Sequence, residues 1–260
     1  MLAVSSAGMR YLRPGEVIED LLEPYRSTDR TPPASGPGCW VMANMVAGLD
    51  GCAAVGGRVG ALSGGVDAEL FRQLRALADV VLVGAETVRR EGYGPVKVSD
   101  AEQARRRAEG RPPLPPVAVV SRSLSFDFGS DLFTAPADDA RTMIITCRAA
   151  APERLAQVSP LAEVVMAGEE QVEPRLALSV LAQLGAKVVL CEGGPSLLGE
   201  IVAAGLLDEL CLTVSPVMGG DPLPVAITPQ GTDLAQFGVS GVAEHDGTLF
   251  LRYLNEARDR

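Results

Sequence analysis

Histidine is nearly absent from this sequence, since His245 is the only one among 260 residues. A zinc cluster, a zinc-dependent deaminase site or a histidine-based catalytic triad therefore has almost no material to be built from. His245 precedes Asp246 in a predicted turn and no nucleophile elbow is present, so a serine hydrolase is disfavoured as well. The five cysteines lie far apart without a C-x-x-C pair, which is typical of buried, reduced thiols. We expect no metal site.

Positive charge and long apolar runs are scarce too. The chain has 23 basic against 33 acidic residues, a formal net charge of −10, which argues against binding to nucleic acid or to an anionic membrane. No run of about twenty uninterrupted apolar residues occurs, and the amino terminus lacks the pattern of a signal peptide. We therefore expect a cytoplasmic protein whose partner is a small molecule.

The composition favours one catalytic domain, because 47% hydrophobic and 22% charged residues suffice for one sizeable core. Residues 1–38 are polar and interrupted by prolines, and we interpret them as an arm that packs on the domain or on a partner subunit. Residues 39–260 then form the domain. Within it, the charged, proline-bounded segment 100–116 is expected to be a mobile excursion.

Apolar runs of strand length alternate with segments of helical spacing along residues 39–260. Strands are predicted from Cys39 onward and at 80–84, 117–121, 142–146, 162–167 and 188–191, with a long strand after residue 205. Asp67 is predicted to cap a helix whose apolar face holds Leu70, Phe71, Leu74 and Leu77. This alternation predicts an α/β fold with a central, mostly parallel sheet, flanking helices and a C-terminal antiparallel strand in GTLFLRYL.

The most informative turn follows the strand that begins at Val188. It reads Glu192, Gly193, Gly194, and a helix is predicted to begin at Pro195. Glycines let the backbone approach a pyrophosphate, and unpaired N–H groups at a helix start point toward it. An ordinary strand-to-helix turn has the same residue types, so the spacing leaves both interpretations open.

A second strand-to-helix junction occurs in VGAETVRREGYG. It puts Gly84 and Thr87 at the carboxyl end of a buried strand, where ligands collect in open α/β sheets. Taken alone, this junction favours simple helix capping by Thr87 and a surface position for Glu91.

Three separated blocks carry a family resemblance: NMVAGLDG, LRALADVVLVGAETVRREG and VVLCEGGPSLLGEIVAAGLLDELCLTVSPVMGG. Together they resemble the carboxy-terminal reductase domain of RibD-type riboflavin enzymes, from about Trp40 to the end. The resemblance implies a dihydrofolate-reductase-like fold, NADPH as cofactor and a homodimer. It implies reduction of the ribosyl group of 5-amino-6-(5-phosphoribosylamino)uracil, or a related pyrimidine, to a ribityl group. The deaminase domain usual in that family needs H-x-E and paired cysteines, which the first 38 residues do not contain.

The resemblance also implies a cofactor site. Its residues are Ala61, Leu62, Ser63, Gly84, Thr87, Glu91, Ser121, Arg122, Gly193, Gly194, Pro195, Ser196, Leu197 and Leu198. The glycine turn and the helix after it would hold the diphosphate, with Thr87 and Glu91 beside its other phosphate and ribose, and residues 61–63 would meet the nicotinamide end. The strand ends at Gly84 and Glu192 are then expected to lie side by side and to turn their N–H groups toward one dinucleotide. Arg122 would pair with the 2′-phosphate and so favour NADPH over NADH, unless it is a solvated loop charge.

For the substrate, four polar positions match the family pocket: Asn44, Asp50, Arg75 and Glu192. Asp50 or Glu192, or water held by them, is expected to deliver the proton that accompanies hydride transfer. Alternatively, Asp50 only caps its Asp-Gly turn.

The chain departs from the family after the Thr87 helix. The family typically has an acidic-acidic-proline turn and then an arginine that grips the substrate phosphate, whereas this chain has Glu91-Gly92-Tyr93-Gly94-Pro95-Val96-Lys97. Lys97 would replace that arginine as a point charge without a forked geometry. Tyr93 and its glycines suit a flat ring, so a dihydrofolate or pteridine reductase stays an alternative. A nucleotide-binding protein without turnover is another.

Overall fold

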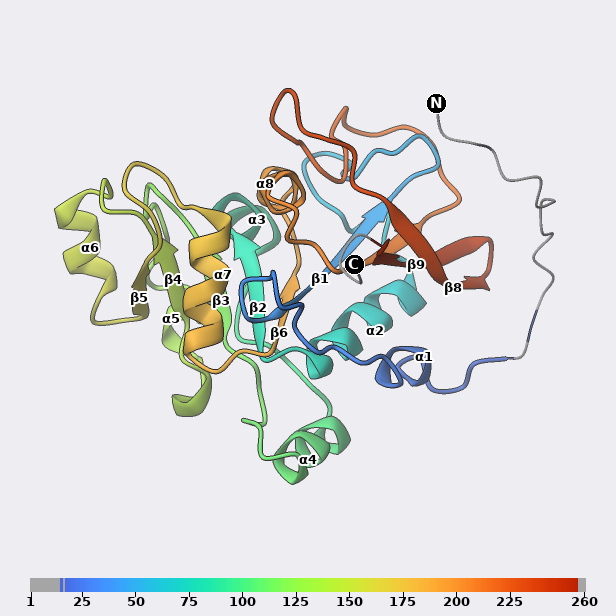
Figure 1. Ribbon diagram of the computed structural model, residues 1–260, viewed down its shortest axis with the longest axis horizontal. Coiled ribbons are helices and arrows are strands. Elements are labelled where there is room, and N and C mark those ends of the chain that lie inside the picture. The colour runs from blue at the N-terminus through green and yellow to red at the C-terminus, as the bar shows by residue number, and fades with distance from the viewer. Residues whose placement is uncertain (1–14, 16, 257–260) are drawn as a thin grey trace.

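The computed structural model describes residue 15 and residues 17–256. A nine-stranded sheet forms the centre of the molecule, with helices on both faces (Figure 1). This confirms the predicted fold class, a mostly parallel α/β sheet with antiparallel strands at its C-terminal edge. No helix in the described part of the chain is both long and apolar enough to cross a membrane.

The strands are β1 (Trp40–Ala47), β2 (Val80–Gly84), β3 (Val117–Val120), β4 (Met143–Thr146), β5 (Glu163–Met166), β6 (Val188–Cys191), β7 (Glu209–Val214), β8 (Phe237–His245) and β9 (Thr248–Asn255). Their order in the sheet is β5-β4-β3-β2-β6-β1-β7-β9-β8. The strands from β5 to β7 in that order pair in parallel, and β9 and β8 continue the sheet in antiparallel pairing. The carboxyl ends of the seven parallel strands therefore share one edge of the sheet.

The helices are α1 (Glu23–Arg26), α2 (Gly65–Leu74), α3 (Ala85–Glu91), α4 (Asp100–Ala108), α5 (Asp131–Thr134), α6 (Pro152–Val158), α7 (Pro174–Gln183) and α8 (Pro195–Ala203), with short 3-10 turns η1 (Arg75–Leu77) and η2 (Asp138–Ala140). Helices α7 and α8 bury one face of the sheet. On the other face, α2 and the chain before β1 cover β6, β1 and β7, while α3, α5 and α6 cover β2, β3 and β4.

Strand β2 shows why the apolar runs predicted the core well. Val80 and Leu82 pack toward α7 and α8, whereas Val81 and Val83 pack toward α3 and α5. A strand covered on both faces needs apolar side chains at every position, which is the pattern that the sequence has there. The predicted bounds 80–84 are the observed ones.

Two local predictions were wrong, and one strand was not predicted. The segment 100–116 is not a free excursion, because it contains α4, which begins at a Ser99 cap and buries Arg106 at 1% exposure. Asp67 is not the cap of α2: Gly64 takes that position, and Asp67 lies in the first turn. Strand β8 was not predicted, because its side chains are mostly exposed at the sheet edge and it lacks an apolar alternation.

The described part of the predicted arm packs against the domain. Leu22 and Tyr25 are buried with residues of α2, and Arg30 forms a two-pronged salt bridge with Glu209 at the start of β7. Residues 1–14 and 16 of the arm lie outside the described residues, and the domain boundary at residue 38 stays a prediction.

Candidate functional site

The two predicted strand-to-helix junctions lie side by side, as expected, and form one structural feature. Strands β2 and β6 are neighbours, with Leu82 paired to Cys191. The N–H of Gly84 donates to the carbonyl oxygen of Gly193 at 2.8 Å. A Cβ atom on Gly84 would lie 3.4 Å from the nitrogen of Gly194. The two turns are therefore in direct contact at the carboxyl edge of the sheet.

Glycine is required in the second of these turns. Gly193 has φ +95°, a backbone conformation that residues other than glycine rarely adopt. A Cβ atom on Gly194 would lie 2.8 Å from the hydroxyl oxygen of Thr87, which is too close without movement. These two glycines thus open the backbone of the turn and let α3 and α8 begin side by side.

Helix α8 offers unpaired N–H groups beside this turn. It begins after Gly194 with Pro195 in its first position, and no side chain caps it. The N–H groups of Ser196 and Leu197 lie in the first turn, where a helix supplies no partner for them. Such groups bind anions, because both the N–H groups and the helix dipole favour negative charge.

A cavity of about 590 Å³ runs along these strand ends. Eleven of the predicted site residues line it: Gly84, Thr87, Glu91, Ser121, Arg122, Glu192, Gly193, Gly194, Pro195, Ser196 and Leu197. The volume lies within the range of about 300–1,000 Å³ usual for small-molecule sites. The structure therefore brings most of the predicted cofactor residues to one space.

The rest of the cavity wall suits a dinucleotide. Apolar side chains that include Met45, Leu178 and Ile227 provide surfaces on which flat rings can pack. Two cations line it, Arg122 and Arg90. Arg122 is exposed and forms no ion pair with the described residues, whereas Arg90 pairs with Glu86 at 2.6 Å. Sequence reasoning missed Arg90, because nothing distinguishes it from its neighbour Arg89.

Four predicted cofactor residues are not part of the cavity lining. Leu62 and Leu198 are buried at 1% and 2% exposure, and Leu198 packs in the core under α8. Ala61 is exposed, and the hydroxyl of Ser63 donates to the carboxylate of Asp67. Contact of residues 61–63 with a nicotinamide ring stays a prediction.

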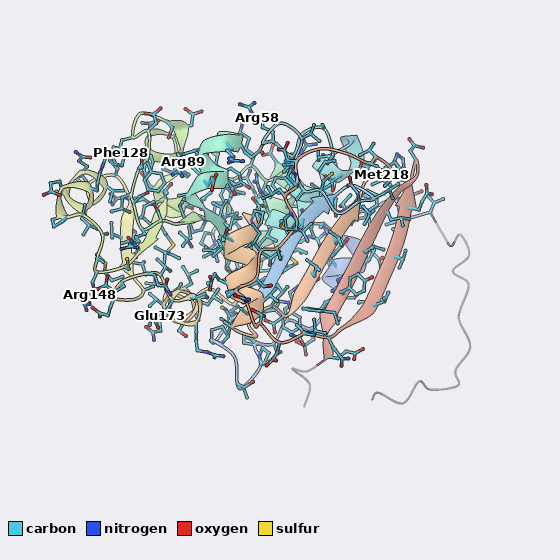
Figure 2. All side chains as sticks on the ribbon, turned by 90° about the horizontal axis from the view of Figure 1, so that it is seen from above. Arg58, Arg89, Phe128, Arg148, Glu173 and Met218 are labelled. Carbon is cyan, nitrogen blue, oxygen red and sulfur yellow. The ribbon has the colours of Figure 1, made fainter. Side chains whose placement is uncertain are left out.

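The glycine-rich loop of residues 56–60 closes one side of the cavity. The Glu91 carboxylate accepts the N–H of Val59 at 3.1 Å, and the Asp221 carboxylate accepts the N–H groups of Gly56 and Gly57. Arg58, between these contacts, projects outward at the edge of the molecule (Figure 2). Glu91 thus has a role in holding this loop in addition to lining the cavity.

Glu192 lies at the centre of a polar cluster. Its side chain is fully buried and accepts two hydrogen bonds of 2.7 Å from Arg75 and one of 2.9 Å from the hydroxyl of Tyr93. Burial, and then the negative charge of Glu192, raises the pKa of Tyr93 well above its usual value, so its hydroxyl stays protonated. The guanidinium of Arg75 also stacks on Phe71, 4.3 Å from the ring centre. The structure thereby brings three predicted substrate residues together.

Glu192 is the one predicted substrate residue in the cavity lining: Arg75 and Tyr93 contact it from behind, and Asn44, Asp50 and Lys97 also lie outside the lining. Asn44 is 8% exposed in β1, and its amide forms no hydrogen bond with the described residues. Lys97 is exposed in the loop before α4. Asp50 is also exposed and accepts the N–H groups of Cys52 and Gly219, which is the capping arrangement. Hydrogen bonds from the Cys52 side chain and from these N–H groups lower the pKa of Asp50.

Across residue 15 and residues 17–256, no three histidine, cysteine, aspartate or glutamate side chains gather closely enough to hold a metal ion.

Comparison with known proteins gives consistent results. The sequence model of the RibD C-terminal domain matches residues 39–242. A 2,5-diamino-6-ribosylamino-4(3H)-pyrimidinone 5′-phosphate reductase of Methanothermobacter thermautotrophicus is 30% identical over 195 residues, which cover 75% of this chain and 86% of the relative. A protein of the same name from Archaeoglobus fulgidus is 29% identical over 187 residues, 71% of this chain and 84% of the relative.

Solved structures agree on the fold. A pyrimidine reductase-like protein from Corynebacterium diphtheriae superposes with a TM-score of 0.77 at 28% identity and covers 84% of this chain and 92% of its own. The riboflavin biosynthesis reductase Rib7 of Saccharomyces cerevisiae superposes with a TM-score of 0.63 at 13% identity, over 90% of this chain and 95% of its own. The second likeness supports the fold alone.

Proposed function

Because the chain belongs to the RibD C-terminal domain family, we propose that it is an NADPH-dependent reductase of a phosphorylated ribosylaminopyrimidine. The names of the two archaeal relatives support this class of substrate. The observation that carries the proposal is the joined pair of turns at Gly84 and Gly193, which opens unpaired N–H groups into a cavity beside the buried carboxylate of Glu192.

The cofactor side of the site is built for a dinucleotide phosphate. The N–H groups of Ser196 and Leu197 bind its diphosphate, and the open backbone at Gly194 lets that group approach. Arg122 pairs with the 2′-phosphate, because its guanidinium lines the cavity and is free to form a two-pronged contact. NADPH, when bound, supplies the hydride.

The substrate side is organised by Glu192. Its salt bridge with Arg75 requires the carboxylate form, so Glu192 accepts hydrogen bonds from the substrate or from water and does not itself carry the proton. Reduction of the open-chain ribosyl C=N group takes one hydride to carbon and one proton to nitrogen. We assign the proton to water held by Glu192, because Asp50 lies outside the cavity lining and accepts the N–H groups of its own turn.

Asn44 and Lys97 complete the proposed substrate contacts. Asn44 has both a donor and an acceptor to offer to a pyrimidine ring. Arg75 is engaged with Glu192, so Lys97 is the cation left for the substrate phosphate among the predicted substrate residues. Tyr93 orients Glu192 through its hydroxyl.

A steady-state assay tests the proposal. Purified protein receives NADPH with one of three compounds: the diaminopyrimidinone phosphate named for the relatives, 5-amino-6-(5-phosphoribosylamino)uracil, or dihydrofolate. Oxidation of NADPH with either pyrimidine and formation of the ribityl product supports the proposal. Oxidation with dihydrofolate alone would make it a pteridine reductase, and tight NADPH binding without oxidation of any compound would make it a binding protein.

A further inference from the structure

Helix α4 lies below the strands in Figure 1, whereas α8 lies near their upper ends. Helix α4 carries a buried cation, Arg106. Arg106 is 1% exposed, whereas Arg105 and Arg107 beside it are exposed. The Arg106 guanidinium donates to the carbonyl oxygens of Ala76 at 2.8 Å and Ala78 at 2.5 Å. It also donates to the carbonyl of Pro112 at 2.8 Å. One arginine thus ties α4, the loop after it and the end of η1 together.

A second arginine completes this contact. Arg111 donates to the carbonyl oxygens of Ala76 at 3.2 Å and Leu77 at 3.1 Å. The carbonyls of the last turn of a helix have no partner within the helix, and cations stabilise that end. Arg106 and Arg111 together therefore hold the C-terminal end of the helical stretch formed by α2 and η1.

Burying the Arg106 guanidinium at this helix end costs more free energy than an ordinary helix end requires. Within the described chain, no carboxylate forms an ion pair with Arg106, and its Nη2 atom has no hydrogen-bond partner. Burial, and then repulsion from Arg111, lowers the pKa of Arg106 to about 10, so the side chain is still a cation at neutral pH. A buried cation without a carboxylate partner is expensive, and a Gly or Lys at the surface would end the helix at lower cost.

The turn held by these arginines carries a residue of the site. Arg75 is the first residue of η1, and its guanidinium forms both 2.7 Å contacts with Glu192. Two of the three carbonyls bound by Arg106 belong to Ala76, directly after Arg75, and to Ala78, directly after η1. Movement of this turn would therefore move the base of the Arg75 side chain and change the direction of the Glu192 carboxylate.

We propose that Arg106 is a positioning residue for the reductase reaction: it fixes η1, and through Arg75 it fixes the orientation of Glu192 in the cavity. This inference rests on the proposed function for its effect on rate. Its structural part, that the Arg75 to Glu192 contact depends on Arg106, stands without it.

The kinetic test is a double-mutant cycle. Arg106→Lys keeps the charge but cannot span three carbonyls, and we expect it to lower kcat/KM for the pyrimidine about tenfold to a hundredfold through misplacement of the site. The Kd of NADPH should change less than about twofold. The Arg75→Lys variant already lacks the two-pronged contact with Glu192. In that variant, Arg106→Lys should lower kcat/KM by less than about twofold further. Equal losses in both backgrounds would overturn the proposal.

Matched variants separate positioning from folding. Arg107→Met, on the exposed neighbour, should leave kcat/KM unchanged. If Arg106→Lys does not fold, as judged by its thermal unfolding transition, Arg111→Gln takes its place in the cycle, because it contacts the same turn from a more exposed position. An additive result with Arg111→Gln would overturn the proposal in the same way.

A crystal structure of the folded variant gives a readout that needs no activity. We expect the two contacts of Arg75 with Glu192 to be broken or lengthened in it, and an intact fork would contradict the positioning role. Should the wild-type protein reduce none of the offered pyrimidines, the proposed function fails, and the variant structure still decides whether Arg106 positions Arg75.

Discussion

At the scale of single residues, the site depends on which side chains form hydrogen bonds with the Glu192 carboxylate. The resemblance identified Glu192 and Arg75 as candidates, the departure from the family after the Thr87 helix drew attention to Tyr93, and the structure joins all three by hydrogen bonds. Their mutual contact was not predictable, because Arg75 lies in η1, Tyr93 in the loop after α3 and Glu192 after β6, and no local pattern in the sequence relates these three segments. The same holds for Arg106: three consecutive arginines look alike in sequence, and only packing decides which one is buried.

The carboxylate of Glu192 gives the first prediction. Glu192→Gln removes the charge that holds Arg75 and replaces an acceptor with a donor, so we expect kcat/KM for the pyrimidine to fall about a hundredfold. Glu200→Gln is the matched control, because Glu200 also lines the cavity but is exposed. A reductase that keeps full activity after Glu192→Gln would contradict the role assigned to this residue.

The turn between β6 and α8 gives the second prediction. In Gly194→Val, the new side chain would collide with Thr87 and fill the space beside the free N–H groups, so the Kd of NADPH should rise about tenfold to a hundredfold. Gly64→Val changes the cap glycine of α2, where the structure shows open space, and should leave the Kd unchanged. Isothermal titration calorimetry measures both, and equal affinities would refute the diphosphate assignment.

Cofactor preference gives the third prediction. We expect Arg122→Ala to weaken binding of NADPH about tenfold and binding of NADH less than twofold, because only NADPH has a 2′-phosphate for the guanidinium to grip. Arg148→Ala, a change on a surface arginine paired with Glu169, serves as the control. Equal losses for the two cofactors would show that Arg122 does not read the 2′-phosphate.

At the scale of elements, burial explains which predictions were right. Strands β2, β3, β4 and β6 were predicted close to their observed bounds, because strands covered on both faces need unbroken apolar runs. Strand β8 was not predicted, because it is an edge strand with polar and glycine residues. Helix α4 was misjudged because its contact with the domain is made by hydrogen bonds from arginines, which a search for apolar faces does not detect.

The N-terminal arm gives the fourth prediction. Arg30, 9% exposed, forms two contacts with the fully buried carboxylate of Glu209, which also binds Arg252 and Trp40. Arg30→Ala should lower the free energy of unfolding by about 2–3 kcal/mol, less than the loss of a sole partner because Arg252 still compensates the charge. Glu209 begins β7, at the end of the sheet away from the cavity, so kcat should be unchanged.

Urea denaturation of Arg30→Ala measures this effect. Arg72→Ala is its control, since Arg72 forms an exposed pair with Glu69 within one helix, and it should cost no more than about 0.5 kcal/mol. An unfolding free energy as high as that of the wild type would mean that the arm is held by apolar contacts alone.

At the scale of the whole molecule, the function depends on strand order. Strands β2 and β6 are separated by 103 residues in sequence, yet they pair directly, so that the glycine turns after them meet at one edge of the sheet. The sequence identified both turns and the likeness to a known family related them to one cofactor. That likeness predicted that the two strand ends lie side by side, and the structure adds the direct hydrogen bond from Gly84 to Gly193, because pairing between distant strands leaves no local signal in the sequence.

The proposed function requires these two turns to bind one dinucleotide, and a crystal structure of the protein with NADPH would show whether they do. We predict that the diphosphate contacts the N–H groups of Ser196 and Leu197 and that the adenosine end reaches Arg122. A cofactor bound elsewhere on the molecule, or a cavity left empty at saturating NADPH, would contradict the proposed function.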